Sequence, residues 1–443
     1  MSRYPRHTGS GSSQIGDPDH PPAQSAVIGA RGATGVGLAS LIAAGSGYLV
    51  LLIAARTLDP ARNAEFLTFW GLLFFVFGIL GGLQNETTRA VHVARTTNES
   101  ESVAHRPAST ANGVRALPAG LAIGAVLALV FVASGAWWGQ RVLGAHPGPL
   151  ILVVAVATLA FSGHSALAGA LAGSGRWSTY ARLVGAESTM RLALVVGMAS
   201  LGARVFGLSA ASATAAGTWL VIMVLSADAR SAAVTRTGDT ARPFLSRTAQ
   251  AMLATAASAA IVVGFPVLLR VSTAPDLFER AAPLLLAVQM TRAPLMIPLT
   301  TYQGVAITYF LTHKDRGAAP LLRLGAIVLT VGAIGAALAA LLGPWLMVTI
   351  FGPSYVVARA TLGALTLAAA FLGILTLTGA AVLATGRHAS YAAGWVTATV
   401  ITVGLLLVPA PIEARTVLAL SAGPAIGVLV HLVAIHRHKA PPG

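Results

Sequence analysis

The feature that most constrains this chain is a series of apolar stretches, each about as long as a helix that crosses a lipid bilayer. Such a helix needs about 20 predominantly apolar residues. Hydrophobic residues make up 55% of the chain and charged residues only 10%, a balance far from that of a soluble domain. The pattern predicts an all-α polytopic membrane protein. The expected spans are 35–55, 65–84, 114–134, 149–172, 183–203, 206–226, 249–269, 281–311, 321–343, 359–384, 389–408 and 416–435.

The twelve expected helices fall into two sets of six, separated by a polar segment that contains four arginines. We therefore expect two six-helix bundles around a central cavity. The expected organisation is a disordered cytoplasmic tail at 1–34, an N-terminal bundle at 35–226, a cytoplasmic linker at 227–248, a C-terminal bundle at 249–435 and a cytoplasmic tail at 436–443.

Two sequence echoes indicate that the halves arose by duplication. The turn Gly175-Arg176-Trp177-Ser178-Thr179-Tyr180-Ala181 has the form GRxx[ST]YA, and the same form returns 211 residues later, beginning at Gly386. The segment around Arg56 resembles the segment around Arg270, 214 residues further on. Two similar segments that recur in the same order, at nearly the same distance along the chain, predict a repeated structural unit.

The distribution of basic residues predicts the orientation. With the N-terminus inside, 19 of the 29 Lys and Arg residues lie in cytoplasmic segments, 8 in outer segments and 2 within spans. Because cytoplasmic loops are enriched in Lys and Arg, both termini are expected in the cytoplasm. Both GRxx[ST]YA turns then lie at the cytoplasmic side, and the two halves are parallel repeats in a bacterial plasma membrane.

Several function classes are disfavoured. The net charge of +15 is explained by cytoplasmic loops, so no nucleic-acid partner is expected. The chain has no Cys, which removes disulfides and thiolate metal sites. The histidines show no metal-ligand spacing, and the loops are too short for a catalytic domain. We expect no enzyme activity and no cofactor, and we expect the tryptophans and tyrosines, including Trp70 and Tyr180, to anchor helices at the membrane interfaces.

Charges inside the membrane are costly and usually face a bundle interior or a water-filled cavity. Arg292 is expected near the middle of the eighth span, in a polar stretch with Gln289, Gln303 and two prolines, Pro294 and Pro298. We expect the prolines to break this helix, as in transporter binding sites. Arg292 is a candidate for a substrate contact in the cavity, and the alternative is a structural arginine that bonds freed carbonyl groups.

Two further pairs of charges are candidates. Arg191 lies near the middle of the fifth span, and Glu187 precedes it by four residues on the same helix face. This pair is either self-neutralised or in contact with substrate. Glu86 and Arg89 are expected just past the second helix, where they either guard an entrance or anchor the helix at lipid headgroups.

Three segments resemble one family in particular. LIAARTLDPARNAEFLTFWGLLF at 52–74, the turn GSGRWSTYARL, and LMVTIFGPSYVVARATLGALTLA at 346–368 are similar to segments of the polysaccharide flippases of the multidrug/oligosaccharidyl-lipid/polysaccharide exporter (MOP) superfamily. These are the types associated with O-antigen and teichoic acid export. The resembling features are spread over residues 35–435.

The resemblance implies a V-shaped pair of bundles that work by alternating access. It implies a substrate that is a glycan on a polyprenyl phosphate or diphosphate, with cavity arginines at the phosphate. Arg292 is the best match to the family's cationic residues, and Arg56 and Arg89 are candidates for a rim or gate. Glycosyltransferases or a polymerase of the same pathway are the implied partners, and coupling to an H⁺ or Na⁺ gradient is open.

Two alternatives compete with a flippase. A cation-coupled multidrug exporter of the same superfamily needs a carboxylate in the membrane, yet the first span has no Asp or Glu and Glu187 has an arginine beside it. A non-transporting scaffold for glycan-assembly enzymes would have long or strongly patterned cytoplasmic segments, and 85–113 and 227–248 are modest ones.

Overall fold

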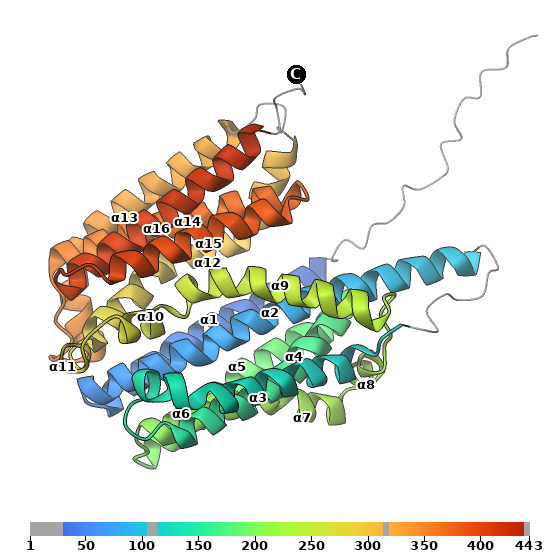
Figure 1. Ribbon diagram of the computed structural model, residues 1–443, viewed down its shortest axis with the longest axis horizontal. Coiled ribbons are helices and arrows are strands. Elements are labelled where there is room, and N and C mark those ends of the chain that lie inside the picture. The colour runs from blue at the N-terminus through green and yellow to red at the C-terminus, as the bar shows by residue number, and fades with distance from the viewer. Residues whose placement is uncertain (1–29, 104–112, 313–318, 438–443) are drawn as a thin grey trace, which may run out of the picture.

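The computed structural model describes residues 30–103, 113–312 and 319–437, and this part of the chain is almost entirely helical (Figure 1). One isolated antiparallel bridge, Arg115 to Arg236, is present in it. The helices are α1 (Ala30–Thr57), α2 (Pro60–Val103), α3 (Ala116–Leu143), α4 (Gly148–Gly173), α5 (Trp177–Ser200), α6 (Val205–Thr214), α7 (Thr218–Leu225), α8 (Ala227–Ala233), α9 (Ala241–Val262), α10 (Phe265–Val271), α11 (Pro275–Phe278), α12 (Ala282–Thr312), α13 (Ala319–Phe351), α14 (Arg359–Ala384), α15 (His388–Leu406) and α16 (Ile412–Arg437).

The described helices have the lengths of membrane spans. Ten helical stretches of the described residues, one of them Val205–Leu225 formed by α6 and α7 together, are long and apolar enough to cross a bilayer, or eleven when the bent pair α9 and α10 counts as one span. The 31-residue α12 coincides with the predicted span 281–311. The predicted all-α, multi-pass architecture is therefore confirmed. The N-terminal residues 1–29 and the C-terminal residues 438–443 lie outside the described part, so the predicted tails are described only where α1 and α16 extend into them.

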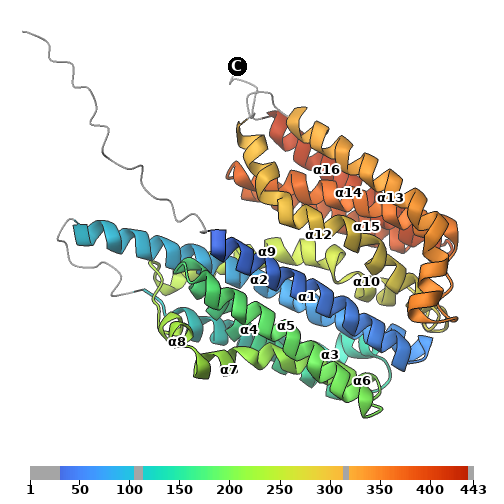
Figure 2. The same cartoon turned by 180° about the vertical axis from the view of Figure 1, so that it is seen from behind.

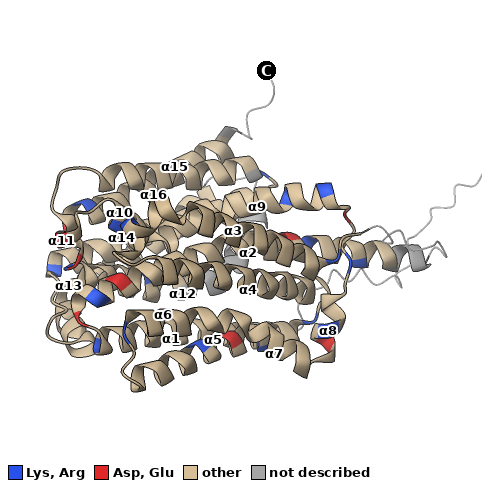
Figure 3. Ribbon diagram, turned by 60° about the horizontal axis from the view of Figure 1, so that its bottom comes forward, with Lys and Arg blue, Asp and Glu red and all other residues tan. Residues whose placement is uncertain are grey.

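The molecule consists of two helical halves. α1 to α8 form one bundle, α12 to α16 form the other, and α9 lies between them (Figures 1 and 2). The bundles converge near α11 and diverge toward the end where α16 finishes, which gives the V shape that the family resemblance implies. Charged residues are concentrated at the two ends of the helices (Figure 3).

The repeated GRxx[ST]YA turn has the same backbone in both halves. Gly175 ends α4 with φ of +74°, and Gly386 ends α14 with φ of +78°, a conformation that favours glycine because it has no Cβ. The next residue in each copy donates its backbone N–H back into the preceding helix, from Arg176 to Leu171 and from Arg387 to Val382. Equivalent turns therefore connect the fourth and fifth spans of each half.

Small residues let α9 pack closely along α2. A Cβ atom added to Gly78 would lie 2.6 Å from Cβ of Ala259, and one added to Gly82 would lie 2.4 Å from the backbone nitrogen of Met252. Further along, the chain breaks between α9 and α10 with a bend of 71°. The span expected at 249–269 is therefore not one continuous helix, because α9 begins at Ala241 and ends at Val262, and α10 covers Phe265–Val271 after the bend.

Other boundaries also differ from the sequence prediction. α2 continues to Val103, so Glu86 and Arg89 lie within a helix rather than past its end, where an i, i+3 ion pair between them supports the helical conformation. α12 runs unbroken through Pro294 and Pro298, so the break expected beside Arg292 is absent from it and lies instead in α9. The segment 227–248 contains α8 and the first turns of α9.

We expect Gly82→Ala to lower the melting temperature of the purified protein by several degrees. The added methyl group meets the backbone of α9 rather than a movable side chain, and such overpacking typically costs about 1–3 kcal/mol. Gly81→Ala is the matched control, because a Cβ there has no atom within 4 Å. Equal melting temperatures for the two variants would contradict close α2–α9 packing.

Candidate functional site: the cavity between the halves

A cavity of about 680 Å³ lies between the two halves. Its walls come from α1, α2, α4 and α5 on one side and from α9 and α12 on the other. The lining is largely apolar and aromatic, with a few polar groups that converge on it, which is the usual composition of a ligand pocket. The polar and charged residues that line it are Tyr48, Gln84, His164, Tyr180, Glu187, Ser188, Arg191, Thr255, Ser258 and Gln289.

Glu187 and Arg191 form an ion pair in the cavity wall, one turn apart on α5. Both residues are about 5% exposed, and Nη2 of Arg191 donates to Oε1 of Glu187. Nε of Arg191 is buried and has no hydrogen-bond partner among the described residues. The pair thus carries no net charge, but Nε of Arg191 is still available to donate a hydrogen bond.

Aromatic rings of α2 surround the Arg191 guanidinium. Its central carbon lies 4.6 Å from the ring centroid of Phe74, 5.9 Å from Trp70 and 6.0 Å from Phe77. A cation at such distances is attracted by the ring quadrupole. Phe77 in turn stacks on Phe161 at 3.8 Å. The rings therefore hold the cation in place while keeping the wall available to an apolar or ring-shaped ligand.

Sequence reasoning missed this aromatic wall. Trp70 and Tyr180 were expected at membrane interfaces, but both line the cavity, and the Tyr180 hydroxyl accepts from Nε2 of Gln84 at 3.3 Å. Trp70, Phe74 and Phe77 recur at helical spacing on α2, which is the signal that marks a common face. His164 was also missed; it is buried, and its Nδ1 has no hydrogen-bond partner in the described chain.

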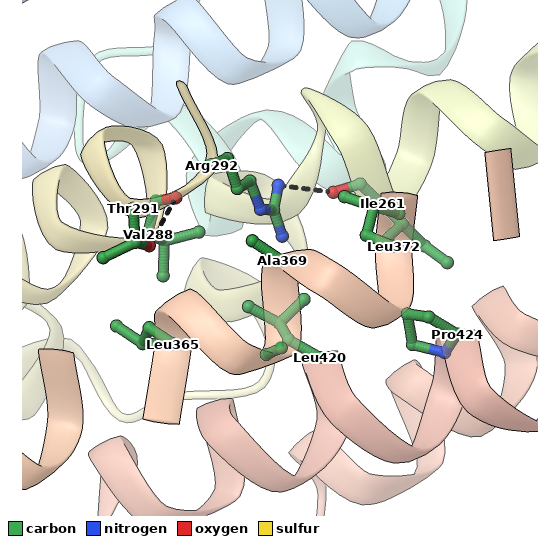
Figure 4. A pocket seen from close by; sticks show the side chains of 10 residues that line it. Ile261, Val288, Thr291, Arg292, Leu365, Ala369, Leu372, Leu420 and Pro424 are labelled. Atoms are coloured by element: carbon green, nitrogen blue, oxygen red, sulfur yellow. Dashed lines mark hydrogen bonds between the residues drawn. The ribbon is translucent and has the colours of Figure 1, made fainter. Parts of the chain in front are cut away.

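Arg292 is buried, as expected, but it does not line this cavity. Its Nη1 donates to the carbonyl oxygen of Ile261 at 3.0 Å (Figure 4). It also donates to the carbonyl oxygen of Val262 at 2.9 Å, and these are the last two residues of α9. The crevice around it, bounded by Leu365, Leu372 and other residues, is too narrow to admit a water molecule. In this conformation Arg292 satisfies the carbonyls freed by the α9 break, the alternative that the sequence left open.

The other residues predicted as site candidates are distributed as follows. Gln289 lines the cavity one turn before Arg292, whereas the side chain of Gln303 lies outside the described residues. Arg56 lies at the end of α1, where Nε and Nη2 donate to the carbonyls of Ile350 and Thr349 at 2.7 and 2.6 Å. It thereby joins the two halves at the end where they converge, together with a buried hydrogen bond of 2.9 Å from Asn63 to the Tyr355 hydroxyl.

Glu86 and Arg89 belong to an ionic cluster away from the cavity. Arg89 donates to Glu86 at 2.5 Å and to Asp239 at 2.6 Å, and Arg247 donates to Asp239 at 2.7 Å. Burial alone would raise the pKa of the Asp239 carboxyl, but the hydrogen bonds from Arg247 and Arg89 hold that pKa below its usual value. The cluster fastens the segment before α9 to α2.

The chain is similar in sequence to known mycobacterial proteins. No family model matches it. The Mycobacterium tuberculosis protein Rv1510 is 38% identical over 409 residues, which are 92% of this chain and 92% of that protein. A second M. tuberculosis protein, Rv3630, is 36% identical over 430 residues, covering 96% and 97%. Neither name states an activity.

Solved structures share the fold. An outward-facing multidrug resistance MATE family transporter of the MOP superfamily matches with a TM-score of 0.64 at 14% identity, over 93% of this chain and 97% of that one. A MOP superfamily transporter from Pyrococcus furiosus, reported with a binding pocket of reverse polarity that suggests a different function, matches with a TM-score of 0.64 at 14% identity, over 92% and 95%. The chain therefore has the MATE-like fold with two helical halves.

Replacing Arg292 tests its structural role. We expect Arg292→Met to lower the melting temperature by several degrees, because two buried carbonyls at the α9 end lose their donor at a cost of about 1–3 kcal/mol. Arg359→Met, which removes an exposed arginine at the start of α14, is the control. If Arg292→Met is as stable as the control, the guanidinium does not stabilise the α9 break.

The Asp239 cluster predicts a pH dependence. The folded-state pKa of Asp239 is lowered, so its stabilisation is present above the unfolded pKa of about 3.9 and is lost as pH falls through the lowered folded value. The difference in melting temperature between the native protein and Asp239→Asn should stay constant from about pH 5 to 8 and shrink below about pH 4. Asp276→Asn, which removes an exposed carboxylate of α11, is the control, and a difference that grows toward acid pH would contradict the cluster's role.

Proposed function

Because the chain belongs to the family of the mycobacterial proteins Rv1510 and Rv3630 and has the fold of MOP superfamily transporters, we propose that it is a membrane transporter. We further propose that it flips an anionic, lipid-linked oligosaccharide across the bacterial plasma membrane by alternating access, for cell-surface polysaccharide synthesis. Both termini lie in the cytoplasm in this proposal.

The observation that carries the proposal is the Arg191 guanidinium in the cavity wall. Its Nε is an unused buried donor, and a buried charge with an unsatisfied donor is costly unless a ligand completes it. A guanidinium can grip a phosphate through two parallel hydrogen bonds. Arg292 also has a buried nitrogen without a partner, Nη2, but it does not line the cavity and its Nη1 is engaged with α9. Arg191 therefore supplies the main phosphate contact.

The remaining walls suit the rest of such a ligand. The rings of Trp70 and Phe74 offer apolar faces to sugar rings, and Gln84 and Gln289 offer amide groups to hydroxyls. The cavity volume of about 680 Å³ is in the range of small-molecule pockets. In this proposal it holds a headgroup of only a few sugar units. The polyprenyl chain stays in the bilayer.

A cation-coupled multidrug exporter is the second candidate, and the MATE transporters that share the fold favour it. Among the lining residues Glu187 is the single acid, and it is paired with Arg191. A cationic drug would meet an already neutralised carboxylate and a fixed guanidinium, which disfavours this alternative. The P. furiosus transporter, whose binding pocket of reverse polarity suggests a different function, supports the view that the fold serves more than one function. A non-transporting scaffold would not need a cavity lined by hydrogen-bond donors, so the cavity disfavours that alternative as well.

Reconstituted flipping tests the proposal. In proteoliposomes, the native chain should move a polyprenyl-diphosphate sugar with a fluorophore on the sugar, read by quenching from one side. Arg191→Gln should slow flipping at least about 10-fold, because charge-assisted hydrogen bonds contribute about 1.5–3 kcal/mol. Arg204→Gln, at an exposed position before α6, should flip normally. Glu187→Gln/Arg191→Gln separates loss of the cation from the effect of an unpaired carboxylate.

Three outcomes would contradict the proposal. Absence of flipping by a folded native chain would favour the scaffold. Transport of cationic dyes without flipping of the lipid-linked sugar would favour the multidrug exporter. Normal flipping by a folded Arg191→Gln variant would remove Arg191 from the mechanism. Repeating the assay with imposed H⁺ and Na⁺ gradients identifies the coupling ion.

A further inference from the structure

The repeated GRxx[ST]YA turn binds a carboxylate in the first half. Nη1 of Arg176 donates to the backbone oxygen of Asp228 at 2.9 Å, and the Thr179 hydroxyl donates to Oδ2 of Asp228 at 3.0 Å. Nη2 of Arg176 also donates to the Ser231 hydroxyl at 3.0 Å. The hydroxyl of the turn thus holds the carboxylate of Asp228 in the first turn of α8, and the arginine holds its backbone oxygen, with Nε 4.0 Å from Oδ1.

The second copy of the turn has the same groups but no such acid. Arg387 and Ser390 occupy the positions of Arg176 and Thr179, on a backbone of the same conformation. In the first half α7 is followed by α8, whereas the described part of the second half ends with α16. No Asp or Glu follows Glu413 in the sequence. The described hydrogen bond of the Arg387 side chain goes to the Ala434 carbonyl of α16.

An open groove lies beside the second copy of the turn. It has a volume of about 390 Å³ and runs between α15 and α16, with Arg387 and Ser390 at one end. Its walls are apolar, and they include Leu429 and Val433, which are 59% and 49% exposed. At the depth of the hydrocarbon layer, such a surface is in contact with acyl chains.

We propose that this groove binds an anionic phospholipid. Its phosphate lies between Arg387 and Ser390, where the Asp228 carboxylate lies in the first half, and one acyl chain fills the groove between α15 and α16. The N-terminus of the 19-residue α15 lies at the same point, and its dipole favours an anion there. The site is separate from the central cavity and does not depend on the transported substrate.

A lipid fits this groove better than other occupants do. The basic end requires a negative partner, and the remaining walls require an apolar one, so the occupant is amphiphilic. Basic residues at the cytoplasmic interface attract anionic lipids, and the expected orientation places Arg387 there. A free phosphate would leave the apolar walls uncovered. A second copy of the chain would bring only Glu413 from its own α15 and α16, and Glu413 lies in the first turn of α16, at the opposite end of that helix from Ala434 and Arg387.

Native mass spectrometry of the full chain tests the site, with dioleoyl phosphatidylglycerol and phosphatidylcholine as probes. We expect a retained phosphatidylglycerol adduct whose affinity falls at least about 10-fold in Arg387→Gln, since charge-assisted hydrogen bonds to phosphate are lost. Arg323→Gln is the matched control. It removes an exposed arginine near the start of α13, two residues from Leu321, which packs against Val382 and Ile435 at this end of the molecule.

A second variant keeps the test decisive if Arg387→Gln does not fold. Ala393→Leu fills the groove from α15 without changing charge, and it should also weaken phosphatidylglycerol binding. Equal binding by Arg323→Gln and the groove variants would overturn the proposal. Displacement of the lipid by millimolar inorganic phosphate would indicate a site for soluble anions. A dimer that is lost in Ala393→Leu would indicate that a second copy of the chain occupies the groove. Either result would also overturn the proposal.

Discussion

The structure depends on one constraint: inside a membrane, each backbone carbonyl and amide must find its hydrogen-bond partner within the protein. Continuous helices meet it along most of the chain, and arginines meet it where helices end or break. Arg292 serves the end of α9 and Arg56 the end of α13. Arg415 donates to the carbonyls of Leu406, the last residue of α15, and Ser272, which follows α10. A chain with 29 basic and 14 acidic residues thus uses some of its excess cations as helix caps rather than as ligand contacts.

This use of arginine explains how far the sequence could predict the site. A guanidinium in an apolar span signals a polar contact, but the sequence does not specify whether that contact is a ligand or a carbonyl. Arg292 and Arg191 look alike in sequence, yet only Arg191 faces the cavity. Most of the spans were predictable because their apolar length is a local property. The bend after α9 falls at Gly264, with Pro266 in the first turn of α10, a local signal that a count of apolar length passes over.

The two halves differ where the duplicated sequence has lost or gained a polar partner. Their turns keep the same backbone, with Gly175 and Gly386 both in the left-handed region. One copy holds Asp228, and the other faces an open groove. In the same way, α1 packs within its own half while α9 leans across onto α2. The repeated turn gives the two halves the same local backbone, and individual side chains give them unequal surfaces.

The Glu187–Arg191 pair sets a condition on any anion that enters the cavity. Glu187 is one helical turn from Arg191 and competes for the same guanidinium at high effective concentration. A small anion that offers charge alone gains little by displacing it. A ligand that also covers the rings of Trp70 and Phe74 buries apolar surface and excludes water, which strengthens its hydrogen bonds to the cation. Under the proposed function, a neutralised arginine on an aromatic wall therefore favours large amphiphilic anions over small ones such as free phosphate.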